Sequence, residues 1–202
     1  MTFQKSIIAL LFAFFLLSCT RNYKLSPDDY SWMPYKGNEN LVFSSNRGET
    51  DTIFFLKKDT ATAYPEAQAL IGITYEVVEI FSKQSDPSPP DTTPRYLESY
   101  FVQLRKSKDK KARLEIGLNT QKAWFYRVQG PQIDSLESLK PMVLKTKAKI
   151  YSDVYVIGPE DWEDISQRSN YVTKVYWSKS EGLVRYEKKN NEYWELTNKF
   201  NY

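Results

Sequence analysis

The chain has 202 residues, and its 28 lysines and arginines against 25 aspartates and glutamates give a formal net charge of +3. This near balance excludes a strongly basic nucleic-acid-binding protein as the leading class. The chain has no histidine and a single cysteine, which excludes Ser-His-Asp and Cys-His catalysis, histidine-ligated metals, zinc ribbons and intramolecular disulfides. The sequence therefore indicates no catalytic residue, no metal and no cofactor.

The N-terminus predicts an export signal. Lys5 is the only charge in the first eighteen residues, and eleven apolar residues from Ile7 to Leu17 follow it. As a helix this run would measure about 16 Å against about 30 Å of hydrocarbon, which is too short for a permanent span and typical of a signal peptide. A buried core helix is the alternative, and the position of the run at the start of the chain disfavours it.

The residues Leu16, Leu17, Ser18 and Cys19 that end this run resemble a bacterial lipobox. The resemblance implies that the Cys19 sulfur is lipidated, that the chain is cleaved before it, and that several acyl chains anchor the product in a membrane. Thr20 stands where an aspartate would often signal retention in the inner membrane. The resemblance therefore implies attachment to the outer membrane of a bacterial cell envelope. It does not decide between the periplasmic face and the cell surface.

This interpretation divides the chain into three segments. Residues 1–18 are the expected signal peptide, residues 19–31 the lipidated cysteine with a polar tether, and residues 32–202 the folded domain. From residue 32 the chain consists mostly of short β-type runs separated by turn chemistry. This pattern predicts a mainly β, single antiparallel meander domain with few short helices, built as a curved sheet, a barrel or a sandwich.

Runs rich in β-branched and aromatic residues predict the strands. They cover residues 41–43, 52–55, 74–81, 96–105, 112–118, 123–128 and one or two strands in 143–156. Asn46-Arg47-Gly48 predicts the turn of a first hairpin. Weak helix signals of one or two turns occur at 65–70, 134–139 and 159–165. The four prolines in residues 82–94 predict a loop or an edge crossing, with a domain boundary as the alternative.

A basic cluster falls at the expected tip of the hairpin made by strands 96–105 and 112–118. Its members are Arg105, Lys106, Lys108, Lys110, Lys111 and Arg113. Such a tip could contact anionic lipid headgroups or an acidic partner. A solvated hairpin end needs no partner, because lysines also protect sheet edges from aggregation.

Pro159 is followed by an acidic cluster that consists of Glu160, Asp161, Glu163 and Asp164. Its carboxylates could bind Ca²⁺, which prefers oxygen ligands. The cluster lacks the spacing of known calcium loops, and acidic residues in the first turn of a helix are explained by the helix dipole.

Three strands over 175–177, 183–186 and 193–196 form the clearest predicted element. The hydrophobic pattern favours a three-residue loop at 189–191 over a two-residue loop, because a slip by one residue would turn every side chain to the other face. This register pairs Tyr186 with Trp194 and Val184 with Leu196, and it places Asn191 in the left-handed conformation.

Aromatic residues on these strands could line a carbohydrate or lipid site, and Trp177, Tyr186 and Trp194 are the candidate ligand contacts. Burial in a small β core is the alternative explanation.

The start and end of the expected domain resemble small uncharacterised lipoproteins of Bacteroidota-type bacteria. The similar segments are 32–37, 41–48, 176–179, 182–187 and 193–196. That resemblance implies no established activity. The layout is also similar to lipoprotein-carrier folds, in which a curved antiparallel sheet wraps a small helical plug.

These observations favour a non-catalytic envelope lipoprotein that acts as a ligand- or partner-binding β module. Its expected partners are the membrane, through the lipid anchor, and an envelope protein or lipid, with no nucleic acid. Two alternatives stay open: a carrier of lipid or another hydrophobic ligand, and a carboxylate-dependent envelope hydrolase. The absence of histidine weakens the enzyme case, since histidine is the commonest proton shuttle near neutral pH.

We predict that Cys19→Ala releases the protein from membranes, because the substitution removes the sulfur that would carry the lipid. Fractionation of cells checks the release, and mass spectrometry of the wild-type protein checks the modified N-terminus. An intact N-terminus, or unchanged membrane association of the variant, would show that the lipobox interpretation is wrong.

Overall fold

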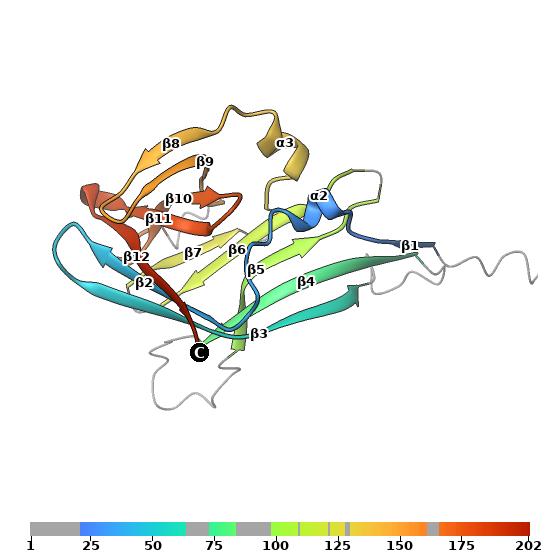
Figure 1. Cartoon of the computed structure of the whole chain (residues 1–202), viewed down its shortest axis with the longest axis horizontal. Helices are drawn as coiled ribbons and strands as arrows, with labels where there is room; N and C mark the ends of the chain where they lie inside the picture. The colour runs from blue at the N-terminus through green and yellow to red at the C-terminus, as the bar shows by residue number, and fades with distance from the viewer. Residues whose placement is uncertain are drawn as a thin grey trace, which may run out of the picture.

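The computed structural model describes residues 21–63, 73–83, 98–108, 110–120, 122–127, 130–160 and 166–202 (Figure 1). The strands of the N-terminal part are β1 (Arg21–Tyr23), β2 (Glu39–Ser45), β3 (Thr50–Ala63), β4 (Ile73–Lys83), β5 (Glu98–Arg105), β6 (Arg113–Asn119) and β7 (Trp124–Arg127). Those of the C-terminal part are β8 (Met142–Lys145), β9 (Ile150–Ile157), β10 (Val172–Ser178), β11 (Gly182–Lys188) and β12 (Tyr193–Asn201). Two short helices, α2 (Pro27–Tyr30) and α3 (Ile133–Glu137), and a 3-10 turn (Lys189–Asn191) complete these parts.

Eleven of these strands form one curled antiparallel sheet in the order β7-β6-β5-β4-β3-β2-β12-β11-β10-β9-β8. The short β1 lies off this path and pairs in parallel with β4. The sheet curls far enough for a bridge to join Trp124 of β7 to Tyr171, the residue before β10. The prediction of a mainly β antiparallel domain is confirmed, and of the three predicted architectures the structure adopts the curved sheet, as a half-barrel.

The predicted hairpins have the expected partners. β2 pairs with β3 around Asn46-Arg47-Gly48, where Gly48 has a φ of 85°. β5 pairs with β6, and the predicted strand region 143–156 contains β8 and β9. Of the predicted helices, the one at 134–139 is present as α3, 65–70 lies outside the described residues, and the described part of 159–165 is not helical.

The proline-rich segment 82–94 is described only at Ser82 and Lys83, which end β4. β4 and β5 lie on either side of this segment and are paired in one sheet, with Val78 opposite Leu104. Because the chain before and after it belongs to one sheet, the segment does not separate two folding units.

The C-terminal meander has the register that the hydrophobic pattern predicts. Tyr186 pairs with Trp194 and Arg185 with Glu195, and Asn191 has a φ of 56°. The two paired aromatic rings stack with their centroids 5.8 Å apart and an interplanar angle of 9°.

The folded part begins earlier than predicted, at Arg21 instead of Trp32. β1 pairs with β4, and α2 is closed by a capping box in which Ser26 Oγ accepts from Asp29 N and Asp29 Oδ2 accepts from Ser26 N. The signal for this helix is present in the sequence, because Ser26 is followed by Pro27 at the first helical position and by an acid three residues on. Of the polar tether expected over 19–31, only Cys19 and Thr20 precede β1.

Large side chains fill the space between the two halves of the sheet. The bulkiest fully buried ones are Trp32, Trp177, Trp194, Tyr35, Tyr186, Phe43, Phe55, Phe101 and Phe125. The ring of Tyr35 lies at the centre of this core, with centroids 4.9 Å from Phe55, 5.7 Å from Phe101 and 5.8 Å from Trp177. Since β3 and β5 belong to one half of the sheet and β10 to the other, this ring joins the halves.

A buried carboxylate fixes the N-terminal segment to the sheet. Asp29 is fully buried and accepts hydrogen bonds from the backbone N of Ala112 at 2.9 Å and from Lys106 Nζ at 3.1 Å, in addition to the Ser26 contacts. Burial alone would raise the pKa of Asp29, but the hydrogen bonds from Ala112, Ser26 and Lys106 outweigh it and lower the pKa below 3.8.

Asp29→Asn is expected to lower the free energy of unfolding by about 2–4 kcal/mol near neutral pH, since an amide replaces one of two charged acceptor oxygens. The folded pKa lies below the unfolded value, so the contribution of Asp29 is complete above that value and is lost as the pH falls through the folded pKa. The loss caused by the substitution therefore shrinks in acid. Urea unfolding at several pH values checks this, with the exposed Asp28→Asn as a matched control that leaves stability unchanged.

Candidate functional site

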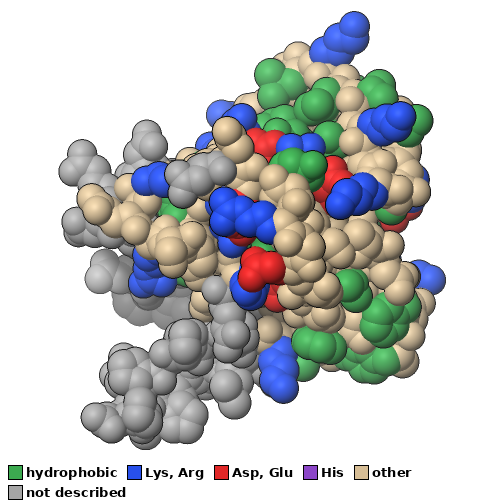
Figure 2. Space-filling view, turned by 90° about the vertical axis from the view of Figure 1, so that its left-hand side faces the viewer, with side chains coloured by type: hydrophobic (Ala, Val, Ile, Leu, Met, Phe, Trp, Pro, Cys, Tyr) green, Lys and Arg blue, Asp and Glu red, His purple; other side chains and the backbone are tan. Residues whose placement is uncertain are grey.

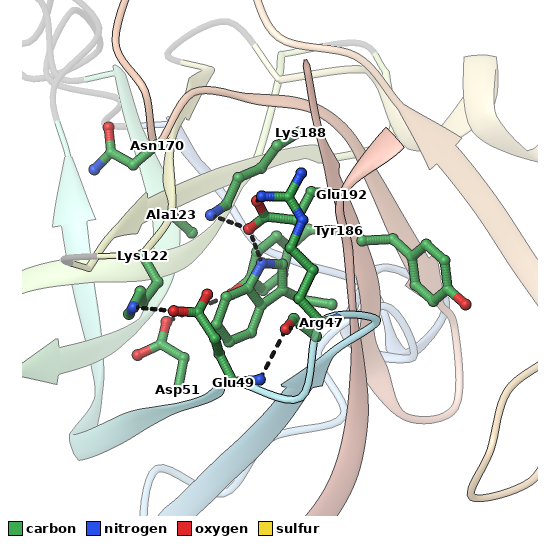
Figure 3. A network of polar contacts seen from close by, with 12 residues as sticks. Arg47, Glu49, Asp51, Lys122, Ala123, Asn170, Tyr186, Lys188 and Glu192 are labelled. Carbon is green, nitrogen blue, oxygen red and sulfur yellow. Dashed lines mark hydrogen bonds and ion pairs between the residues drawn. The ribbon is translucent and has the colours of Figure 1, made fainter. Parts of the chain in front are cut away.

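Three hairpin ends meet at one end of the sheet and bring polar side chains together (Figure 3). We call this group the hairpin-end network. Its members are Arg47, Glu49 and Asp51 from the β2–β3 hairpin, Thr120 and Lys122 from the β6–β7 hairpin, and Tyr186, Lys188, Glu192 and Trp194 from the β11–β12 hairpin. Two of the three aromatic residues predicted to contact a ligand, Tyr186 and Trp194, thus belong to it.

Glu192 is the centre of one half of the network. Its Oε1 accepts from Trp194 Nε1 at 2.7 Å and from Lys188 Nζ at 2.6 Å, and its Oε2 lies 3.2 Å from Arg47 Nη1. Burial alone would raise the pKa of Glu192, but Lys188 and Trp194 outweigh it and lower the pKa. A carboxylate held in its charged form by three donors is suited to fixing the hairpin, not to accepting a proton.

Asp51 is the centre of the other half. It accepts from Thr120 Oγ1 at 2.8 Å and from Tyr186 Oη at 3.4 Å. Burial, together with the nearby carboxylate of Asp51, raises the pKa of Tyr186 well above its ordinary value. The phenol therefore stays protonated and acts as a donor. Thr120 Oγ1 in turn accepts from the backbone N of Ala123 at 2.9 Å, so the network also closes the β6–β7 turn.

The predicted ligand contacts all lie in the core. Trp177, Tyr186 and Trp194 are each 0% exposed. Trp177 lies beside Tyr35, away from the network, and its buried Nε1 has no hydrogen-bond partner among the described residues. A ligand could reach these three rings only if the core opened.

The structure redistributes the predicted basic tip. Lys106 pairs with Asp29, Lys111 pairs with Glu137 of α3, and Arg113 Nη1 donates to the carbonyl of Gly130 at 3.4 Å. Arg105 and Arg113 are paired in the β5–β6 register, and the positive charge of each favours the charged form of the Glu115 carboxyl. Lys108 and Lys110 are exposed, so they are the members of the predicted tip that stay accessible to an anionic surface.

Glu115 on β6 has the most strongly raised pKa among the described carboxyl groups. Its side chain is 5% exposed, and burial outweighs the attraction of Arg105 and Arg113 and raises the pKa to about 7. The nearby carboxylates of Glu160 and Glu79 contribute to this rise. Glu79 accepts a hydrogen bond from Gln103, its neighbour across the β4–β5 pair. If the protein were a hydrolase, Glu115 would be the group able to exchange a proton near neutral pH.

A second surface, which the sequence analysis missed, lies on the outermost strand and its hairpin turn. We call residues 139–150 the cationic edge. They contain four lysines and no acid, and their exposed apolar side chains are Leu139 (53% exposed), Met142 (38%), Val143 (65%) and Ile150 (64%). In the sequence, this surface is visible as a run of apolar residues and lysines without an aspartate or glutamate, but the run matches no fixed motif. Figure 2 shows hydrophobic side chains among lysines and arginines toward the top of the molecule, the level at which β8 and β9 lie in Figure 1.

No group of histidine, cysteine, aspartate and glutamate side chains that could hold a metal ion occurs among the described residues. Of the predicted acidic cluster, Glu160 is described and 161–164 lie outside the described residues. Within the same described ranges, no helix has the length and apolar character needed to cross a bilayer.

Comparison of the chain with models of known protein families, with curated proteins and with solved structures finds no match.

Glu192→Ala is expected to lower the free energy of unfolding by about 2–4 kcal/mol, because it leaves the Lys188 ammonium, 7% exposed, without its carboxylate. Glu49→Ala is the matched control. Glu49 also binds a lysine, Lys122 at 2.8 Å, but both side chains are at least 40% exposed. Urea unfolding should show no measurable change for the control. Equal losses in the two variants would show that burial does not distinguish the two ion pairs.

Proposed function

We propose that this protein is a non-catalytic lipoprotein of the bacterial cell envelope, anchored through Cys19, that binds its partner with the outside of its sheet. The lipobox-like sequence and the order of charge and apolar residues before it support the anchor. The outer membrane is the destination that Thr20 supports.

One observation carries the choice of the outer surface: the side chains able to hold an apolar ligand are already packed against one another. Tyr35 contacts rings from both halves of the sheet, and Tyr186 stacks on Trp194. The exposed apolar side chains lie instead on the outside, over the cationic edge and over β3 and the end of β12. Exposed apolar groups that gather together commonly mark interaction surfaces.

The two alternatives rest on narrower features. A lipid carrier is favoured by the half-barrel shape, but it would have to displace core side chains such as Trp177 to make room. A hydrolase is favoured by Glu115, whose pKa of about 7 suits proton transfer. Against it, the hydrogen bond from Gln103 engages the neighbouring carboxylate of Glu79.

Native mass spectrometry of the protein purified from its own envelope tests the proposal. We expect the mass of the chain from Cys19 with its covalent acyl groups and no further enclosed lipid, because the core has its own side chains in place of a ligand. One additional lipid per chain, retained in stoichiometric amount, would favour the carrier. Hydrolysis of an envelope glycan or ester that is lost in Glu115→Gln would favour the hydrolase.

A further inference from the structure

We propose that the cationic edge, residues 139–150, is a second membrane-contacting site that binds an anionic lipid surface directly. The inference rests on the proposed function only in taking the protein to be tethered at a membrane. The proposed partner of the outer surface is a bilayer that contains anionic lipid, contacted at its headgroups and upper acyl region.

The apolar half of this surface comes from side chains that point away from the core. Val143 and Ile150 are 65% and 64% exposed, although both are β-branched residues that ordinarily pack inside a sheet. Leu144, the neighbour of Val143 on β8, is 6% exposed and faces the core. On β8, Leu144 therefore packs toward the core, whereas Met142 and Val143 leave apolar surface exposed.

The cationic half comes from lysines that have no ion pair within the part of the chain that the structure describes. Lys140, Lys145 and Lys147 form no ion pair with a described residue, whereas Lys149 pairs with Glu181 at 2.6 Å. A second carboxylate, that of Glu195, accepts from the backbone N of Lys147 at 3.2 Å.

Compared with the predicted basic tip, where Lys106 and Lys111 are neutralised by Asp29 and Glu137, this surface keeps its positive charge. Exposed apolar groups interleaved with uncompensated lysines match an anionic bilayer surface in both polarity and charge.

A strand-forming partner fits the same place less well. β8 is the outermost strand of the path, but Pro141 precedes it, a bulge falls between Met142 and Leu144, and Lys145 ends it. Prolines, bulges and lysines are the devices by which sheets discourage pairing along an edge. The surface is thus suited to contact through its side chains and not through its backbone.

The position of the edge relative to the anchor gives the contact an orientation. β1 and the β8–β9 turn lie toward opposite ends of the long axis of the molecule (Figure 1). Two residues, Cys19 and Thr20, precede β1, which gives a reach of about 7 Å from the lipid. A domain held by Cys19 at one end and by the cationic edge at the other would lie with its long axis along the bilayer.

The experiment uses the lipidated chain in which Val143→Cys carries an environment-sensitive fluorophore. Cys19 is the only native cysteine, so an acylated Cys19 leaves the new residue as the single labelling site. The protein is reconstituted in vesicles of phosphatidylcholine alone or mixed with phosphatidylglycerol. We expect a blue shift at Val143→Cys in the anionic vesicles only, and none for the control Phe54→Cys, which is 46% exposed on β3.

Substitution of Lys140, Lys145 and Lys147 by glutamine in the labelled chain should abolish the shift. At about fivefold per lysine, the three changes weaken the contact on the order of 100-fold. Sodium chloride near 0.5 M should weaken it in the unsubstituted chain, since screening shortens the reach of the charges. A shift that is equal in neutral vesicles, or that survives the three substitutions, would overturn the lysine contact, and no shift in any vesicle would overturn the site altogether.

The failure of the anchor would be seen separately. If the wild-type chain, with no introduced cysteine, takes up the label, then the Cys19 sulfur is not lipidated and the proposed anchor is wrong. The response of the probe at residue 143 to added anionic vesicles, in a chain that also carries Cys19→Ala, would still decide whether the cationic edge binds lipid.

Discussion

Tyr35 is the residue on which the two halves of this sheet depend. A sheet curled into a half-barrel must fill its own interior, and here a residue that precedes the first long strand does so. The Tyr35 ring contacts aromatic rings of β3, β5 and β10, and its hydroxyl accepts from the backbone N of Leu183 at 2.7 Å. The contact requires a glycine at 182, because a Cβ there would lie 2.1 Å from the hydroxyl oxygen. Burial of that hydroxyl raises the pKa of Tyr35, which keeps the phenol neutral in the core.

Local patterns were sufficient to predict much of this fold. Alternation and turn chemistry predict the β2–β3 and β5–β6 hairpins, and one left-handed residue, Asn191, fixes the register of the last pair. What they do not predict are pairings between distant segments. β12 pairs with β2 across some 150 residues, and β1 continues the sheet beside β4, although nothing in either sequence specifies its partner. Such pairings are decided by the packing of the whole core, which a window of ten residues does not contain.

The candidate sites show the same division between local and distant information. The residues of the basic tip are close together in the sequence, but the carboxylates that neutralise Lys106 and Lys111 come from α2 and α3. The aromatic pair Tyr186 and Trp194 is correct as a pair, yet the hairpin-end network closes over it. In both cases the sequence identifies residue types and the fold decides whether they are accessible. The cationic edge was missed for the converse reason, since exposure of a β-branched residue is not visible in its identity.

The place of β12 in the sheet has a consequence for the order in which the chain can fold. Although it is the last strand in the sequence, it lies between β2 and β11 near the middle of the sheet. In the strand order, β12 joins the N-terminal strands β2 to β7 to the strands β8 to β11, so the sheet cannot be completed until residues 193–201 have been synthesised. Pairings of such long range form slowly, because a large loop must close before any contact compensates for the lost entropy. A nascent chain of this topology therefore holds all the other strands of the path before it holds the strand that joins its two halves.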